Sequence, residues 1–491
     1  MKIEAKKPGH SFKKGDTILL FMPEPEGTKK PVLLPAEFSY VSKLLDLSYF
    51  KGKQAEVVFA PLADRPAVII CGTGKQSDTD AESLRRCVAG AVSLCREKSI
   101  KKIHVLVPAI QGIDNTTVLS SIAEGIYLSN YSFDRYKTKN KGNGKPLVET
   151  AVFHTAAKDA AAIMKKTALV CGNTLLCRDL INEISEKCDS RGMAREAKSL
   201  ERIPGVSCTV YGKREIEKMK MGLLLAVNKG SAKPPMLVVL KYRGGRPGQK
   251  YVAIVGKGIT FDSGGINLKP SGHIEDMRTD MAGAAAALYA LKTAAELKLP
   301  VNLYAVLPLT DNMISPESFR PGDVYTAYDG TTVEIGNTDA EGRLILADAL
   351  SYAVKVLRPE VIIDIATLTG SCLATFGEAV ACYLTTDDDL GRLLEDAAAS
   401  TGEAIWRLPF VKEYDDNMKS DIADICNMSS EKNAGTIMGG IFLKHFAGKG
   451  KWAHIDIAST ARATKQRGYR PKEATGFGVR LLVETIINWK K

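Results

Sequence analysis

The chain reads YVAIVGKGITFDSGG from Tyr251 to Gly265, and this stretch predicts a strand that runs directly into a glycine-rich loop. The opening run is apolar and partly β-branched, as is typical of a buried strand. Glycines on both sides of Lys257 and after Asp262 let the backbone come close to another group. An alanine-rich run after Asp280 then predicts a buried helix. Strand, loop and helix in this order are typical of an α/β protein.

The glycines of this loop do not match the common nucleotide-binding patterns. Gly-x-Gly after a strand suggests a dinucleotide loop, but the third glycine and its spacing do not fit. A phosphate loop is disfavoured because Gly-Lys-Ser/Thr is missing. Asp280 stands at the start of a helix with almost no polar side, so its carboxylate needs a partner. Both a metal ion and the dipole of the helix itself remain candidates for that partner.

A second stretch, NTDAEGRL from Asn337 to Leu344, places two carboxylates one residue apart. In a loop that leaves a strand, Asp339 and Glu341 can turn toward one point and offer the oxygen ligands that divalent cations prefer. Arg343 adds a permanent planar cation beside the same point. Taken alone, the octapeptide is equally well explained as a helix N-cap followed by an acidic first turn.

Together the two stretches resemble the signature motifs of the leucyl aminopeptidase family, the hexameric two-metal enzymes also called cytosol aminopeptidases. Each residue alone has a plainer explanation as a surface lysine, a turn aspartate or a core methionine, and the joint occurrence at family spacing carries the resemblance. Shorter segments resemble the family in the same order: TLTG at 367–370, WRLP at 406–409, AGTI at 434–437, WAHIDIA at 452–458 and ATGFGVR at 474–480.

The resemblance implies a site with two divalent ions per subunit, Mn²⁺ or Zn²⁺. Their implied ligands are Lys257, Asp262, Asp280, Asp339 and Glu341. Lys257 would bind through an uncharged amine, so its pKa must fall far below that of a free lysine. The implied catalytic cations are Lys269 and Arg343, with a bicarbonate ion on Arg343 as the general base. The implied side-chain pocket contains Met277, Thr367 and Gly370.

The implied function is a metal-dependent aminopeptidase that hydrolyses the N-terminal peptide bond of peptides and dipeptides through a water activated by two metals. Peptide substrates and a homohexamer follow from the same resemblance. The preferred N-terminal residue, including whether Cys-Gly is a substrate, and the physiological metal stay open. A DNA-binding protein and a two-metal phosphoesterase are the alternatives, and the second would need more phosphate-binding cations than Lys269 and Arg343.

Length and composition favour two domains. A chain of 491 residues is too long for one core. We expect a smaller N-terminal α/β domain over residues 1–165, regulatory or associated with oligomers, and a larger catalytic α/β domain over residues 166–491 with a central mixed sheet flanked by helices. The ten cysteines form no Cys-x-x-Cys pair, so reduced and mostly buried thiols are expected.

Net charge and targeting signals bear on partners and location. The formal net charge is +11, from 67 basic and 56 acidic residues. Lysine pairs such as Lys101-Lys102 and Lys165-Lys166 could bind nucleic acid, although solvated surface lysine is the commoner explanation. The N-terminus lacks the apolar run of a signal peptide, and no run of about 20 apolar residues predicts a membrane span. A cytoplasmic location is expected.

Apolar runs and helical periodicity predict alternating elements in both halves of the chain. The expected strands are Thr17–Met22, Glu56–Ala60, Ala67–Cys71, Ile103–Val107, Met236–Tyr242, Tyr251–Gly256, Val301–Pro308, Val361–Ala366 and Trp452–Ile457. The expected helices are Ala81–Lys98, Asn115–Leu128, Ala160–Asn173, Ala282–Leu297, Leu344–Leu357, Leu390–Ser400, Ile437–Phe446 and Thr475–Asn488. The candidate ligands then fall at strand ends, where open α/β sheets place their sites.

Overall fold

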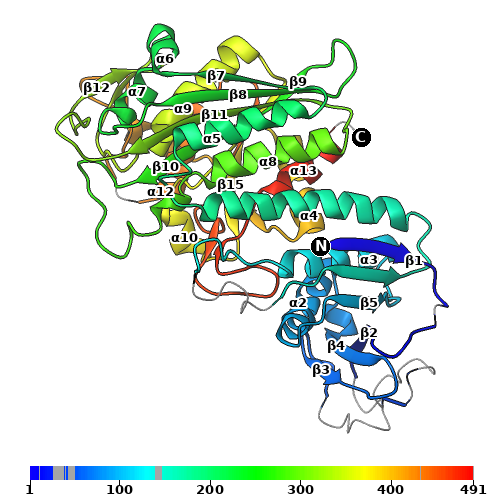
Figure 1. Ribbon diagram of the computed structural model, residues 1–491. Coiled ribbons are helices and arrows are strands. Elements are labelled where there is room, and N and C mark those ends of the chain that lie inside the picture. Colours follow the sequence, from blue (N-terminus) through cyan, green and yellow to red (C-terminus); the bar gives the residue numbers. More distant parts are fainter. Residues whose placement is uncertain are drawn as a thin grey trace. The chain divides into compact units, whose positions relative to one another are not determined.

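The computed structural model describes residues 1–9, 11–25, 38, 40–41, 50–138, 146–431 and 433–489 (Figure 1). The chain divides into two compact units. The first contains Met1–Leu175 and Thr464–Lys472, and the second contains Leu176–Ala463 and Glu473–Lys491. Both units combine sheets with helices, which confirms the expected two-domain α/β class.

The first unit is built on a six-stranded sheet in the order β1-β6-β5-β2-β4-β3. All pairs are parallel except β3 with β4. Its strands are β1 Lys2–Lys6, β2 Thr17–Glu24, β3 Val57–Ala60, β4 Ala67–Lys75, β5 Lys102–Leu106 and β6 Thr150–His154. Its helical segments are η3 Gln76–Asp78, α2 Ala81–Glu97, α3 Asn115–Ser129 and the first part of α4 Ala160–Asn182.

Local sequence accounts for the helices of the first unit. Helix α2 begins with a capping box, in which the Ser83 N–H donates to Asp80 Oδ1 at 2.7 Å and the Asp80 N–H donates to Ser83 Oγ at 2.8 Å. Helices α2 and α3 approach closely at Gly125, where a Cβ would lie 2.4 Å from the Arg85 carbonyl oxygen. The absence of a side chain at Gly125 therefore sets the distance between the two helices.

The second unit is built on a nine-stranded sheet in the order β16-β15-β18-β14-β9-β11-β8-β7, with β10 pairing with β11. Strands β18, β14, β9 and β11 run parallel, whereas β15 and β8 join them antiparallel. The strands are β7 Val206–Tyr211, β8 Met236–Arg243, β9 Tyr251–Gly256, β10 Gly258–Asp262, β11 Asn302–Asn312, β14 Val361–Ala366, β15 Ala381–Thr385, β16 Ile405–Arg407 and β18 Lys451–Asp456. Smaller sheets contain β12 Val324–Thr326, β13 Thr332–Glu334 and β17 Ile425–Cys426, and β19 Arg462–Ala463 and β20 Glu473–Ala474.

Helices cover both faces of the nine-stranded sheet. Helices α8 and α13 pack together on one face, and α7, α9 and α12 form a layer on the other. The α-helices of this unit are α5 Ser190–Ser199, α6 Lys213–Met219, α7 Gly222–Asn228, α8 Ala282–Glu296, α9 Gly342–Tyr352, α10 Gly370–Phe376, α11 Asp388–Thr401, α12 Gly435–Lys444 and α13 Val479–Asn488. Short helical segments are η4 Leu200–Arg202, η5 Met277–Thr279, the π-helical η6 Ala353–Leu357 and η7 Lys412–Met418.

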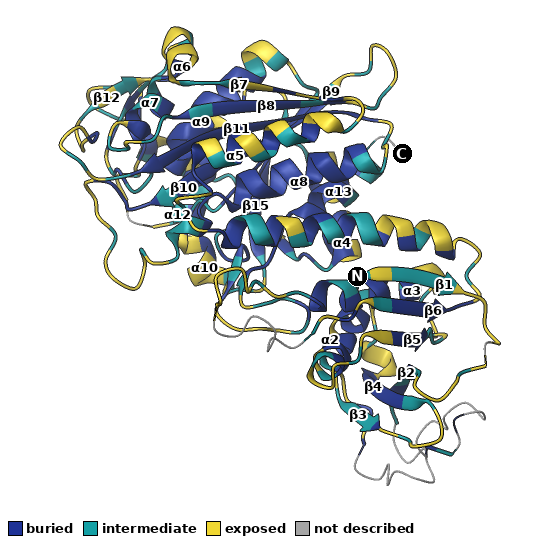
Figure 2. Ribbon diagram, viewed as in Figure 1, coloured by how far each residue is buried: buried dark blue, intermediate teal, exposed yellow. Residues whose placement is uncertain are grey.

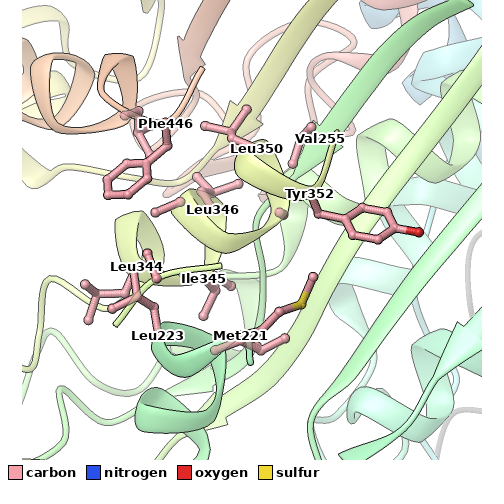
Figure 3. Close-up of a cluster of buried hydrophobic side chains, with 14 of the residues drawn as sticks. Met221, Leu223, Val255, Leu344, Ile345, Leu346, Leu350, Tyr352 and Phe446 are labelled. Atoms are coloured by element: carbon pink, nitrogen blue, oxygen red, sulfur yellow. The ribbon is translucent and has the colours of Figure 1, made fainter. Parts of the chain in front are cut away.

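Helices α8 and α9 are almost completely buried, which fits a sheet with two covered faces (Figure 2). Helix α9 contributes Leu346 and Leu350 to a large core cluster that also holds Phe446 and Val255 (Figure 3). Burying one such side chain stabilises the fold by about 1.5–3 kcal/mol. The core therefore holds helix α9 in place, and with it the end of the loop that carries Asp339 and Glu341.

The sequence led us to expect reduced, mostly buried cysteines and no membrane span. All ten cysteines are free thiols and nine of them are buried, as expected. In the described part of the chain, no helix combines the length and the apolar content that a membrane span requires.

Candidate metal centre

The candidate ligands gather where strands of the nine-stranded sheet end. Lys257 lies between β9 and β10, and Asp262 is the last residue of β10. Asp280 follows η5 and precedes α8, and Glu341 immediately precedes α9. Thr367 follows β14. The expectation that these residues lie at strand ends and in the adjoining loops holds for the structure.

Three carboxylates form the centre of this site. Asp262, Asp280 and Glu341 are all buried, and each offers an oxygen atom within 4.8 Å of the others. Burial, followed by repulsion from Asp262, raises the pKa of Glu341 to about 8. Burial likewise raises the pKa of Asp280 to about 6, against the opposing effect of Lys257. Like charges this close need cations between them.

Lys257 supplies one of these cations. Its Nζ lies 2.8 Å from Asp280 Oδ2 and 3.0 Å from Glu341 Oε1, and it donates to the Thr367 carbonyl oxygen at 2.8 Å. Burial alone would lower the pKa of Lys257, but the surrounding carboxylates outweigh burial and raise it. Lys257 is therefore an ammonium group in this arrangement, and it could bind a metal ion only after it had released one proton.

Lys269 supplies the second cation. Its Nζ lies 2.9 Å from Asp262 Oδ2 and 2.5 Å from Asp339 Oδ1. The loop that carries it turns at Gly264, whose φ is +87°. A Cβ at Gly264 would meet the Asn267 carbonyl oxygen at 2.4 Å and Asp339 Oδ1 at 2.9 Å. The turn therefore requires glycine, both for its backbone conformation and for space.

Gly342 provides the space that Lys257 occupies. A Cβ on Gly342 would lie 2.4 Å from Lys257 Cε and 2.6 Å from its Nζ. Because Gly342 is also the first residue of α9, the position of the lysine amine is tied to the buried start of that helix. The two sequence motifs therefore contact each other where Gly342 of one packs against Lys257 of the other.

Arg343 is buried and faces a carbonyl group and an aromatic ring. One of its guanidinium nitrogens donates to the Asn427 carbonyl oxygen at 2.8 Å, and its Cζ lies 5.9 Å from the ring centroid of Phe442. Burial lowers the pKa of Arg343 to about 10. Among the described residues, no carboxylate forms an ion pair with Arg343. Its remaining N–H groups therefore suit a small planar anion.

The three pocket residues expected from sequence occupy different surroundings. Thr367 Oγ1 donates to Asp280 Oδ1 at 2.7 Å, so it touches the carboxylate cluster directly. Met277 is half-buried, and its carbonyl oxygen accepts from the Asp280 N–H at 3.3 Å. Gly370 is exposed, and a Cβ there would have no atom within 4 Å. Thr367 therefore contacts a candidate ligand directly, Met277 lies three residues before one, and Gly370 lies three residues after Thr367.

Sequence reasoning missed two asparagines that organise the site. Asn312 Nδ2 donates to Asp262 Oδ1 at 2.8 Å and to the Thr338 carbonyl oxygen at 3.0 Å. Asn427 Nδ2 donates to the Asn337 carbonyl oxygen at 2.8 Å. Asn312 ends an apolar run, LYAVLPLTDN, and a polar residue at the end of a buried strand was a usable signal. No comparable pattern marks Asn427, which lies in an irregular segment.

His454 belongs to a buried polar group between two strands. It lies in β18 beside Asp364 of β14, and its Nδ1 is 2.5 Å from Asp364 Oδ1. Trp452 Nε1 donates to the other oxygen of Asp364 at 2.6 Å. This buried group joins two central strands and does not contact the carboxylate cluster.

The donor set at the centre is suited to divalent metal ions. It offers carboxylate oxygens and one amine, which hard and intermediate cations accept. Glu341 Oε2 is buried and has no hydrogen-bond partner within the described residues, although a buried carboxylate oxygen normally has one. Fold and site together define a two-domain α/β protein with a candidate centre for divalent metal ions.

Comparisons with known proteins agree with that class. The model for the catalytic domain of the cytosol aminopeptidase family matches residues 175–483, and the model for its N-terminal domain matches residues 17–140. The chain therefore belongs to the cytosol aminopeptidase family and is a metal-dependent aminopeptidase, as the two motifs predicted.

Individual relatives cover nearly the whole chain. A probable cytosol aminopeptidase of Protochlamydia amoebophila (strain UWE25) is 38% identical, over 97% of both chains. One from Geobacter sp. (strain M21) is 41% identical, over 91% of both. Among solved structures, the bottromycin maturation enzyme BotP in complex with Mn has a TM-score of 0.87 and 31% identity, covering 97% of this chain and 100% of that one.

Proposed function

We propose that the protein removes N-terminal residues from peptides and dipeptides by a two-metal mechanism. The observation that carries this proposal is the buried cluster of Asp262, Asp280 and Glu341, with oxygens within 4.8 Å of one another and two lysines against them. The proposed ligands of two divalent ions are Lys257, Asp262, Asp280, Asp339 and Glu341. The structure of BotP in complex with Mn supports Mn²⁺ as the metal, and Zn²⁺ suits the same donors.

Bound divalent ions would supply a polarised substrate carbonyl and a water molecule of lowered pKa. The protein's part is to hold the ligands in fixed positions. Asn312 and the Gly264 N–H both donate to Asp262 Oδ1, at 2.8 and 2.9 Å, which orients its other oxygen. Thr367 orients Asp280 in the same way through the 2.7 Å hydrogen bond to Oδ1. Such supporting hydrogen bonds fix ligand geometry and are worth about 10–100-fold in metal affinity or activity.

Lys269 and Arg343 are the proposed catalytic cations. Ion pairs with Asp262 and Asp339 place the Lys269 ammonium group beside the carboxylate cluster, where it can stabilise the oxyanion that develops on the scissile carbonyl. Arg343 is the proposed holder of bicarbonate, which would accept a proton from water and pass it to the leaving amine. The support for this role is a buried guanidinium that donates to the Asn427 carbonyl oxygen and, within the described residues, forms no ion pair.

Met277, Thr367 and Gly370 are the proposed pocket for the N-terminal side chain of the substrate. Open space around Gly370 supports this assignment, because a substrate can approach its backbone. The half-buried Met277 offers a flexible apolar wall. We therefore propose a preference for apolar N-terminal residues such as leucine.

Metal removal tests the proposed function. The protein is dialysed against a chelator and assayed with leucine p-nitroanilide and a Leu-Gly dipeptide, before and after addition of Mn²⁺ or Zn²⁺. We expect activity to disappear on chelation and to return with about two metal ions per chain. Activity that survives complete demetallation, or full recovery with no bound metal, contradicts the proposal. Assays with and without bicarbonate test the role of Arg343.

Assembly, location and the role of the N-terminal residues are further parts of the proposal. By family resemblance we propose a homohexamer in the cytoplasm, with residues 1–165 as a regulatory or oligomer-associated domain and residues 166–491 as the catalytic domain. The name of the curated relatives supports the location. Light scattering coupled to size-exclusion chromatography measures the mass, and a value of six chains is expected.

A further inference from the structure

Strands β19 and β20 form the base of a hairpin whose two ends belong to different units. Arg462 pairs with Ala474, and Ala463 pairs with Glu473. The base belongs to the second unit, whereas the nine residues between the strands, Thr464–Lys472, belong to the first. The hairpin is therefore one continuous stretch of chain that is held at its tip by one unit and at its base by the other.

The tip is held by a buried tyrosine. Tyr469 is 2% exposed and lies in a small apolar cluster with Leu128 and Cys171. Its hydroxyl lies 3.0 and 3.1 Å from the two carboxylate oxygens of Glu82. Arg86 Nε donates to the same carboxylate at 2.8 Å. A buried ring with a satisfied hydroxyl makes the tip a firm attachment.

The base carries a ring of four alternating charges. Arg462 Nη2 lies 2.6 Å from Asp276 Oδ2, and Arg462 Nε lies 3.2 Å from Glu473 Oε2. Arg278 closes the ring, with Nη2 at 3.3 Å from Glu473 Oε2 and Nη1 at 3.8 Å from Asp276 Oδ1. All four side chains are 27–31% exposed. Planar guanidinium groups that each bridge two carboxylates restrict geometry more than a single exposed ion pair does.

Two members of the ring lie on either side of Met277 in the chain. Asp276 and Arg278 are its direct neighbours, and Asp280 follows two residues after Arg278. Thr279 Oγ1 donates to the Asp276 carbonyl oxygen at 2.8 Å, and the Asp280 N–H donates to Met277. Both neighbours of Met277 are thus held by charges from the hairpin. Asp280 is held separately, by Lys257 and Thr367.

We propose that Arg462 and Glu473 are positioning residues that set the preference for the N-terminal side chain of the substrate by fixing Met277. This inference rests on the proposed function, because it assigns Met277 to the pocket.

The test compares Arg462→Met with wild type on two substrates, leucine and alanine p-nitroanilide. For the variant, kcat/KM on the leucine substrate falls by about three- to tenfold, mainly through KM, while the alanine substrate changes by less than about twofold. Lys465→Met is the matched control, since Lys465 is exposed on the same hairpin and the same charge is removed. The control retains the wild-type ratio of the two substrates.

Two further variants keep the test decisive if Arg462→Met is poorly folded. Arg462→Lys retains one charge and gives a smaller loss in the same direction. Glu473→Gln removes the charge that pairs with both Arg278 and Arg462, and it shifts the substrate ratio in the same direction by about twofold. Equal losses on both substrates, or an unchanged ratio in all three variants, overturn the inference. A wild-type protein that is inactive on both substrates instead overturns the proposed function.

Discussion

In both units the parallel strands have their carboxyl ends on the same side of the sheet, but the side chains that gather at these ends differ between the two units. In the first unit, β5 and β6 end at a cavity of about 370 Å³. Its lining is mainly apolar and includes Phe12, Leu106 and Phe21 of β2. His154 lines it and lies 3.0 Å from His104. In the second unit, the strand ends carry the buried acids and lysines of the candidate metal centre. The described residues contain no second acidic cluster with metal-ligand geometry.

This difference shows that the fold provides a place for a site at the strand ends, whereas the residues at that place decide which chemistry is possible. Parallel strands create a comparable edge in both units. In the second unit, glycine lets a lysine side chain approach the carboxylates at this edge, as at Gly342 against Lys257. Charged groups could gather at that edge because cations and carboxylates alternate, which lowers the free-energy cost of burying each of them.

Replacing Glu341 by glutamine tests most directly whether the acids at the strand ends of the second unit bind metal, and it has the largest expected effect. The change removes a charge from the metal-type cluster while keeping its shape. We expect kcat/KM to fall by about 10²-fold or more, with loss of bound metal, because Glu341 is a proposed ligand and one of its oxygens has no hydrogen-bond partner among the described residues. Metal content and kinetics are measured together. Glu317→Gln, an exposed acid-to-amide control, retains both.

Gly342→Ala tests whether glycine at the second edge makes room for the lysine. The added Cβ falls within 2.6 Å of Lys257 Nζ, so the amine must move away from its carboxylates. We expect at least about tenfold lower activity and a loss of about 1–3 kcal/mol in the free energy of unfolding. Gly370→Ala is the control for stability, since no atom lies within 4 Å of its Cβ. Equal stability of the two variants contradicts the steric account.

Asp348, a buried acid outside the candidate metal centre, provides a comparison for Glu341. Asp348 accepts hydrogen bonds from the N–H groups of Leu223, Leu224 and Tyr328, at 3.0, 2.8 and 2.7 Å, so both of its carboxylate oxygens have protein donors. Even so, burial raises the pKa of Asp348 to about 7. Glu341 differs because one of its oxygens has no such donor among the described residues.

The raised pKa of Asp348 predicts a pH-dependent stability, the smallest of these effects. Between pH about 4 and about 7 the folded state binds a proton that the unfolded state has released. The contribution of this group is therefore complete below pH about 4 and is lost as the pH rises through about 7. We expect wild type to lose about 2 kcal/mol relative to Asp348→Asn between pH of about 5 and about 7.5, measured by urea unfolding. Parallel pH profiles contradict the assignment.

Much of the fold was predictable because the central strands are continuous apolar runs. Strand β9 has the predicted bounds, Tyr251–Gly256, and β14 and α8 differ from prediction by at most one residue. Strands β1 and β6 were missed because they are short, and β1 alternates charged with apolar residues. Helix α13 begins at Val479 instead of Thr475, because the preceding residues form a turn with Gly476 and Gly478 at positive φ.

The candidate site was predictable only where chemistry is local in sequence. The motifs around Lys257 and Glu341 carry their own glycines and acids, so the roles proposed for them follow from residue type and family spacing. Asn427 and the ring of Arg462 and Glu473 depend on contacts between segments that lie far apart along the chain. No periodicity or motif records such contacts, and only the folded structure brings them together.

An anomalous-difference map of crystals soaked in Mn²⁺ tests the central claim most directly. The account predicts two strong peaks among Lys257, Asp262, Asp280, Asp339 and Glu341, with Lys257 Nζ drawn away from its ion pairs toward one of them. A map without peaks at this position, in a protein that still cleaves leucine p-nitroanilide, would contradict it.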